Sequence, residues 1–226
     1  MTPALETSRL FLRPLELADA AQVQRLFPHW DIVKHLNARV PWPYPDDGAH
    51  VFFRDVELPA MERGEHWTWT IRLREQPDQL IGSISLMKGE HENRGFWLGL
   101  PWHGQGLMTE ASDAVTDFWF DVLRFPVLRV PKAIANTASR GISEKQSMRV
   151  VAVLERDYVC GRLPAEIWEV TAAEWRARRR ENEGTEGTGS HRAAEKRGRT
   201  EEDASGSTAG PRSGPMPAVK SDRKRE

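Results

Sequence analysis

The sequence RGFWLGLPWHGQGLMTEA, residues 94–111, decides the fold of this chain. Its first half, Phe96–Leu100, is a short apolar run that predicts a buried strand, and its second half opens a long amphipathic helix. Gly104 and Gly106 allow a sharp turn between the two and let a ligand approach the backbone without meeting a Cβ atom. The first N–H groups of the helix have no partner within it and lie at the positive end of its dipole, so an anion such as a pyrophosphate suits the turn.

The glycine pair alone leaves two interpretations open, a structural strand-to-helix turn and a phosphate cradle. A Walker loop needs lysine and then serine or threonine after the last glycine, but Leu107 and Met108 follow Gly106. A dinucleotide fingerprint needs a third glycine where Thr109 stands. The rest of the chain has to distinguish the two interpretations.

Size and composition favour one soluble domain. The chain has 226 residues and a net charge of −1, from 32 basic and 33 acidic side chains, which indicates no nucleic-acid partner. Cys160 is the single cysteine, so neither an internal disulfide nor a thiolate metal site is expected. The charged N-terminus does not resemble a signal peptide, and no window is apolar for the length of a membrane span. We therefore expect a cytoplasmic protein with no membrane association and no metal.

Apolar periodicity divides the chain into alternating strands and helices. Strands are predicted at residues 8–13, 67–73, 80–87, 96–100, 127–135, 150–160 and 166–171. Helices are predicted at 19–27, 47–63, 107–123, 137–148 and 172–179, with Asp19 capping or beginning the first and Asn136 or Thr137 capping the fourth. Val150–Leu154 is the most densely apolar run and predicts a buried strand.

Two segments lie outside this pattern. Residues 28–45 are rich in proline and aromatic side chains, which fits either the rim of an acceptor pocket or loops fixed to a core by tryptophans. Residues 181–226 are polar and carry mixed charges, which predicts a disordered, solvated tail after a domain at 1–180.

Three segments resemble the GNAT acetyltransferase superfamily, in the branch of the Rim-type amino-terminal acetyltransferases of ribosomal proteins. They are LETSRLFLRPLELAD at residues 5–19, GFWLGLPWHGQGLMTEA at 95–111 and NTASRGISEK at 136–145. The resemblance covers about residues 5–176. It implies an α/β (α+β) GNAT fold with a mixed, mostly antiparallel central sheet of about six to seven strands flanked by helices.

The resemblance implies transfer of an acetyl group from acetyl-CoA, the co-substrate, to a primary amine by direct attack, and it favours the phosphate cradle. The acceptor would be a protein amino terminus or a small molecule, and the enzyme a monomer or homodimer. The family's pantetheine-pairing strand falls on Trp97, Leu98, Gly99 and Leu100, and a backbone N–H there would stabilise the oxyanion. Its pyrophosphate loop falls on His103, Gly104, Gln105, Gly106, Leu107, Met108 and Thr109, and further cofactor contacts fall on Asn136 and Ser139.

The catalytic residues follow the same resemblance. Ser139 stands where Rim-type enzymes have a serine proposed to protonate the leaving thiolate, and it is the first candidate for the proton donor. Ser143, which replaces the tyrosine acid of other relatives, and a water are the alternatives. Pro101 replaces the arginine or glutamine that usually begins the loop. Glu166 and His66 are the candidate bases. Cys160 is not expected to act as a nucleophile. A non-catalytic acyl-CoA-binding or scaffold module is the alternative function, and a dinucleotide-binding oxidoreductase is a third.

Overall fold

The computed structural model describes residues 1–181, and the structural statements below concern that part of the chain. Residues 1–180 form one compact unit. The predicted tail lies outside the described residues, apart from Glu181. In chain order the elements are β1 (Leu5–Glu6), β2 (Leu10–Pro14), η1 (Leu17–Asp19), α1 (Ala20–Leu26), α2 (Trp30–Val33), α3 (Gly48–Phe52), η2 (Phe53–Glu57), α4 (Leu58–Glu62), β3 (His66–Leu73), β4 (Gln76–Met87), β5 (Arg94–Leu98), η3 (Leu100–Trp102), α5 (Leu107–Asp117), η4 (Phe118–Val122), β6 (Val127–Ala133), α6 (Thr137–Lys145), β7 (Arg149–Tyr158) and β8 (Gly161–Thr171). A last helix begins at residue 172.

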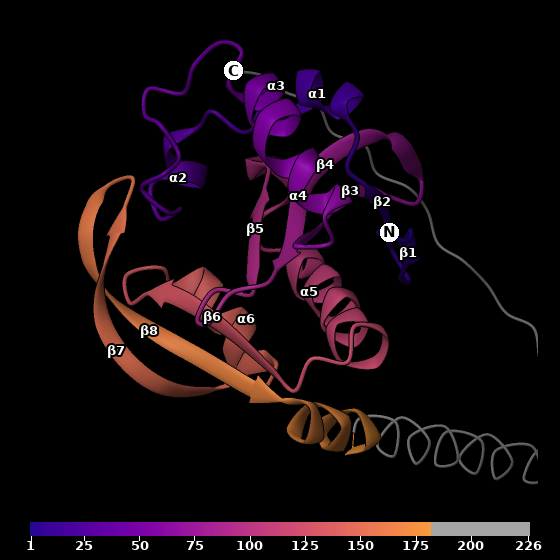
Figure 1. Ribbon diagram of the computed structural model, residues 1–226, viewed down its shortest axis with the longest axis vertical. Helices are drawn as coiled ribbons and strands as arrows, with labels where there is room; N and C mark the ends of the chain where they lie inside the picture. Colours follow the sequence, from indigo (N-terminus) through magenta and orange to yellow (C-terminus); the bar gives the residue numbers. More distant parts are fainter. Residues whose placement is uncertain (182–226) are drawn as a thin grey trace, which may run out of the picture. The chain divides into compact units, whose positions relative to one another are not determined.

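The first sheet has five antiparallel strands in the order β1-β2-β3-β4-β5. Helices α1, α3 and α4 lie on one side of it and α5 on the other (Figure 1). Strict alternation in β3 sends Trp67, Trp69 and Ile71 into one core, where they pack with α5 and η4. The alternation that predicted this strand therefore places its apolar residues on one face, against α5 and η4.

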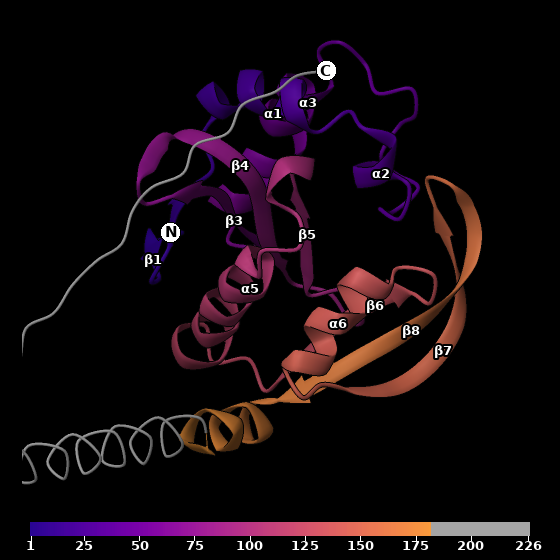
Figure 2. The ribbon, with the colours of Figure 1, turned by 180° about the vertical axis from the view of Figure 1, so that it is seen from behind.

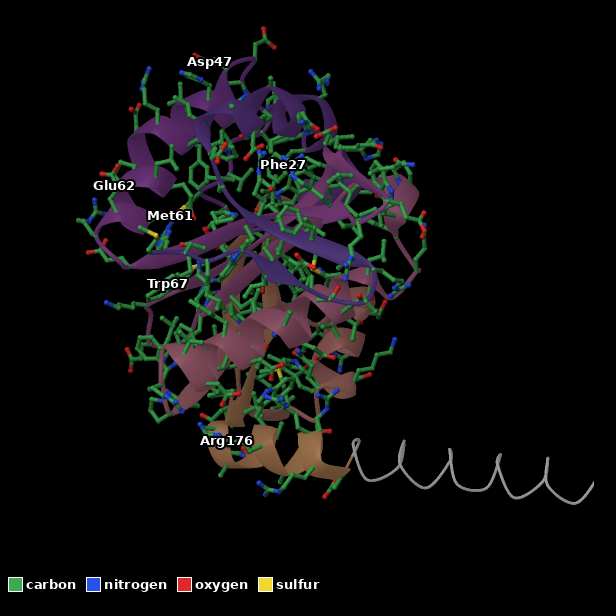
Figure 3. All side chains as sticks on the ribbon, turned by 90° about the vertical axis from the view of Figure 1, so that its right-hand side faces the viewer. Phe27, Asp47, Met61, Glu62, Trp67 and Arg176 are labelled. Atoms are coloured by element: carbon green, nitrogen blue, oxygen red, sulfur yellow. The ribbon has the colours of Figure 1, made fainter. Side chains whose placement is uncertain are left out.

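A second core lies under the amino-terminal helices. Phe27 is 7% exposed there, and its ring meets those of Tyr44 and Trp97 edge-on. Figure 3 shows Phe27 inside this packing, whereas Asp47 and Glu62 lie on the outside of the helical layer. The predicted helix over residues 47–63 is present as α3, η2 and α4 in succession.

A buried ion cluster ties α1 to the first sheet. Asp19 stands at the N-cap position of α1, where the sequence predicts it, but its side chain makes no cap hydrogen bond to that helix. Its carboxylate instead accepts hydrogen bonds from Arg72 at 2.7 Å and Arg13 at 2.5 Å. Asp19 and Arg72 are 2% and 1% exposed. Short-range patterns do not reveal this pair, because its members are 53 residues apart.

The second sheet has three antiparallel strands in the order β6-β8-β7. The prediction of a buried strand at 150–154 is wrong, since Val150, Val151, Val153 and Leu154 are all more than a third exposed. These residues lie in β7 at the edge of the sheet. Their apolar run correctly indicated a strand, but burial depends on what covers a strand.

The two sheets diverge between β5 and β6 (Figure 2). Near the start of both strands the backbones still touch, because the Asn93 N–H donates to the Arg129 carbonyl and the Arg129 N–H donates to Asn93 Oδ1. The backbone N–H and carbonyl of Arg129 face β5, and because backbone groups alternate along a strand, the nitrogen of Pro131 faces β5 as well. Proline has no N–H, so the next hydrogen bond from β6 to β5 has no donor, and the two strands separate there. The predicted α+β class with antiparallel strands flanked by helices is confirmed, with its strands divided between two sheets.

Candidate active site

A cleft of about 750 Å³ occupies the gap between β5 and β6. One wall is the edge of β5 with Trp97 and Leu98, and the opposite wall is β6 with Pro131 and Lys132. The glycine turn and α6 line it on one side, and residues from 31–37 line it on the other. The cleft therefore connects the predicted phosphate site with a second surface formed near the amino-terminal helices.

The glycine turn has the backbone geometry that its sequence predicts. Gly104 has φ 73° and Gly106 has φ 76°, which are left-handed values that side chains with a Cβ rarely adopt. A Cβ on Gly104 would meet no protein atom within 4 Å, so the space beside this backbone is open to a ligand. The first intrahelical bond of α5 runs from the Glu110 N–H to the Gly106 carbonyl, which leaves earlier N–H groups for a phosphate.

A polar anchor fixes the start of α5 to the amino-terminal strands. Glu110 accepts hydrogen bonds from Thr7 Oγ1, Ser8 Oγ and both the backbone N–H and the side chain of Arg9, at 2.6–2.9 Å. Burial raises the pKa of Glu110, but these hydrogen bonds outweigh it and leave the pKa below its ordinary value. Arg9 also donates to the Gln105 carbonyl at 3.0 Å. The anchor thus holds the glycine turn in place.

The edge of β5 turns the backbone groups of Leu98 towards the cleft. The Gly99 N–H donates to the Ile81 carbonyl in β4 at 2.8 Å, so alternation turns the N–H of Leu98 the other way, towards the gap. The Leu98 carbonyl points to the same side and is bonded to His103 Nε2 at 2.8 Å. An extended ligand could pair with this edge, and the Leu98 N–H could stabilise an oxyanion.

Helix α6 places a serine and an asparagine at the cleft. Asn136 caps the helix as predicted, and its Oδ1 accepts from the Ser139 N–H at 3.1 Å. Both residues line the cleft. Ser139 Oγ in turn accepts a hydrogen bond from Lys132 Nζ at 2.7 Å.

The far wall of the cleft is closed by the tip of the β7–β8 hairpin. The N–H groups of Val159 and Cys160 donate to the carbonyls of Leu36 and Lys34, both at 3.0 Å. Tyr158 lines the cleft and is 8% exposed, yet its hydroxyl has no partner among the described residues. Burial raises the pKa of this phenol, so the hydroxyl keeps its proton and remains a donor.

The sequence of residues 9–149 matches the acetyltransferase (GNAT) domain family. The chain belongs to the GNAT acetyltransferase family. It is therefore an acyl-CoA-dependent transferase, as the resemblance implied. No curated protein sequence matches it significantly.

Solved structures agree with this GNAT assignment in their fold. RimL, a ribosomal L7/L12 α-N-protein acetyltransferase in complex with coenzyme A, is 14% identical with a TM-score of 0.64, over 75% of this chain and 98% of that one. The ribosomal-protein-S5-alanine acetyltransferase of Vibrio fischeri is 13% identical with a TM-score of 0.64, over 76% and 98%. A GNAT acetyltransferase from Bacillus anthracis is 18% identical with a TM-score of 0.63, over 76% and 100%.

The GNAT cleft brings together most of the predicted cofactor residues. Those that line it are Trp97, Leu98, His103, Gly104, Gly106, Leu107, Met108, Thr109, Asn136 and Ser139. Gly99, Leu100 and Gln105 do not line it. The Gln105 side chain donates to the Pro101 carbonyl, so it stabilises the turn from outside the cleft.

The two predicted bases of this GNAT chain lie elsewhere. Glu166 does not line the cleft, and its carboxylate accepts from Arg140 at 2.8 and 3.1 Å and from Trp168 Nε1 at 3.0 Å. His66 Nδ1 lies 3.1 Å from Glu57 and is also absent from the cleft.

Trp30 and Trp42 pack against each other with 42% and 43% exposure and line neither the cleft nor a core. From the aromatic stretch, only residues within 31–37 line the cleft.

Sequence reasoning missed Lys132. Lys132 lies on the same buried face of β6 as Leu128 and Val130. Because side chains alternate between the two faces of a strand, this spacing of two residues could have indicated that the lysine is buried. No group of three or more histidine, cysteine or acidic side chains among residues 1–181 could hold a metal. No helix in this described part of the chain is long and apolar enough to cross a membrane.

Proposed function

We propose that this chain transfers an acetyl group from acetyl-CoA to the amino terminus of a peptide by direct attack of the amine. The continuous cleft carries this proposal, because it extends from an open left-handed glycine turn at a helix N-terminus to a second region lined by residues from 31–37. When bound, acetyl-CoA would supply an activated acyl group as a thioester. The open space beside Gly104 and the free edge of β5 fit its pyrophosphate and its extended arm.

The residues of the cleft divide the chemical work. The Leu98 N–H would stabilise the charge that develops on the acyl oxygen. Ser139 would donate a proton to the leaving sulfur, because its hydroxyl lines the cleft on the α6 side. The hydroxyl of Tyr158 would donate a hydrogen bond to the acceptor, since it lies buried and unpartnered on the opposite side.

His35 is our candidate for the base in place of Glu166. It lines the cleft on the acceptor side, and burial followed by the charge of Lys34 lowers its pKa below 6.5. The imidazole is therefore neutral at pH 7 and can accept a proton. Such a weak base suits a peptide amino terminus, whose pKa is about 8, better than a lysine with a pKa of about 10.4.

The test is a thiol-release assay with acetyl-CoA and matched acceptors. We expect release with peptides that have a free amino terminus and none with the same peptides carrying an N-acetyl cap. Small amines form the third arm. Thermal stabilisation by acetyl-CoA without release on any acceptor would contradict the proposal and support the non-catalytic module.

Replacing His35 with asparagine is expected to lower kcat/KM at pH 7.5 by about 100-fold, the usual contribution of a general base. In the parent protein kcat/KM should fall as the pH drops through the lowered pKa of His35, because protonation removes the base. This acidic limb should be absent in His35→Asn. A variant that kept both the rate and the limb would rule out His35.

Replacing Tyr158 with phenylalanine is expected to raise the KM of the peptide acceptor by about 3- to 10-fold, which corresponds to one neutral hydrogen bond. The KM of acetyl-CoA should stay the same, because Tyr158 lies on the acceptor wall. Steady-state kinetics with each substrate varied in turn separates the two. An unchanged acceptor KM would show that the hydroxyl does not contact the acceptor.

A further inference from the structure

Lys132 is a buried lysine inside the cleft. It is 5% exposed, and its Nζ donates to Ser139 Oγ at 2.7 Å. The same ammonium group lies 4.4 Å from the centre of the Phe96 ring on β5. Lys132 thus contacts both walls of the cleft. Its hydrogen-bond partner is the Ser139 hydroxyl, which donates to the leaving sulfur in the proposed reaction.

The charged groups around Lys132 leave it without an acidic partner among the described contacts. Glu166 is its cross-strand neighbour on β8, but that carboxylate is held by Arg140 of α6. Arg94 on β5 is buried and adds positive charge, and Asp113 of α5 acts electrostatically on Arg94. Burial first, and then the charge of Arg94, lower the pKa of Lys132 well below its ordinary value.

Stability does not explain a lysine at this position. Leu128 and Val130 on the same face of β6 are fully buried apolar residues. An apolar side chain at 132 would avoid the cost of burying an ammonium group that lacks a counter-ion. A costly group of this kind in a cleft is typical of a functional residue.

We propose that Lys132 is the proton reservoir behind Ser139, so that the two side chains form a relay to the leaving thiolate. This inference rests on the proposed function. As the carbon–sulfur bond breaks, the sulfur takes the proton of Ser139 Oγ–H, and Ser139 Oγ takes a proton from Lys132 Nζ, which becomes neutral. The attacking amine loses one proton to the base, which releases it to water, and Lys132 takes one proton from water, so both groups are restored before the next turnover.

Acid strength supports this direction of transfer. A thiol has a pKa of about 8.5, and an ordinary lysine near 10.4 is too weak an acid to protonate its thiolate favourably. Burial makes the Lys132 ammonium a stronger acid, and Ser139 bridges it to the cleft. Lys132 is therefore a positioning and proton-holding residue that acts through Ser139.

Kinetics of four variants test the relay. Lys132→Met and Ser139→Ala should each lower kcat by about 100-fold, and the double variant should lose no more than either single one, because both interrupt one path. In the parent protein kcat should fall as the pH rises through the lowered pKa of Lys132, since deprotonation empties the reservoir. Lys132→Met should lack this alkaline limb. Lys132→Arg keeps the charge but holds its proton too tightly, so it should be as slow as Lys132→Met.

Two measurements do not depend on turnover. Lys132→Met should raise the melting temperature of the ligand-free protein, whereas a structural role predicts a fall. With coenzyme A bound, the ultraviolet absorbance of the thiolate should show the same thiol pKa in the parent protein and in Lys132→Met, because Lys132, as the stronger acid, is already neutral when the thiol ionises. Lys88→Met is the matched control, because Lys88 also lies over an aromatic ring, at 5.8 Å from Trp67, but outside the cleft.

The outcomes separate the relay from the proposed function. Additive losses in the double variant, full activity of Lys132→Arg, or a lower thiol pKa in the parent protein than in Lys132→Met would each overturn the relay while acetyl transfer stands. Absence of acetyl transfer by the parent protein would overturn the proposed function instead. In that case the thiol titration still shows whether Lys132 keeps its proton while the bound thiol ionises.

Discussion

Replacing Gly106 with valine is expected to abolish binding of acetyl-CoA. The residue has φ 76° and begins α5, so a β-branched side chain would distort the turn and occupy the approach to the helix N–H groups. Each hydrogen bond lost to a charged group costs about 1.5–3 kcal/mol, so losing those from several helix N–H groups would weaken binding by orders of magnitude. Isothermal titration with acetyl-CoA measures the loss directly.

Gly64 provides the matched control for this substitution. It has φ 68°, and a Cβ there would meet no atom within 4 Å, whereas a Cβ on Gly106 would make only an ordinary contact with Arg9 Nη2 at 3.6 Å. Gly64 follows α4 and does not line the cleft. Gly64→Val and Gly106→Val should therefore lose similar stability, about 1–2 kcal/mol for a side chain forced into left-handed backbone. Only Gly106→Val should lose acetyl-CoA. Unchanged affinity in Gly106→Val would refute the phosphate cradle.

Replacing Asp19 with asparagine is expected to destabilise the fold by about 3–5 kcal/mol, the usual cost of breaking a buried ion pair from one side. Arg72 would keep its charge at 1% exposure and lose its carboxylate. Asparagine preserves the shape of the side chain, so packing changes little. Denaturant unfolding should show a lower midpoint with the same slope.

Asp55 serves as the surface comparison for Asp19. It forms an ion pair with Arg54 at 2.6 Å, but both side chains are about half exposed. Asp55→Asn should therefore cost no more than about 1 kcal/mol. A double change of Asp19→Leu and Arg72→Met should recover much of the stability lost in Asp19→Asn, because it removes both buried charges. An Asp19→Asn variant as stable as the parent would show that the pair contributes nothing.

Local chemistry made much of the fold predictable from sequence. The left-handed glycines, the Asn136 cap and the alternation of Trp67, Trp69 and Ile71 depend on neighbours a few residues away. A sequence records such relations directly as periodicity and spacing. The strand, turn and helix around residues 94–111 were therefore expected nearly as they occur.

Contacts between distant segments were not predictable in the same way. The bond from Lys132 to Ser139 and the pair of Asp19 with Arg72 depend on how sheets and helices pack. The exposure of Val150–Leu154 depends on the absence of a covering layer over β7 in the described part of the chain. Sequence position alone made Glu166 and His66 candidate bases. Their contacts with Arg140 and Glu57 depend on the three-dimensional packing.

Pro131 also determines how the enzyme meets its substrates. Because a missing N–H on one strand keeps two backbones apart, the passage exists before any substrate arrives. Entry through this passage then breaks no β-ladder between the two sheets. The opening is built into the covalent structure of the chain, because a proline nitrogen has no hydrogen to donate.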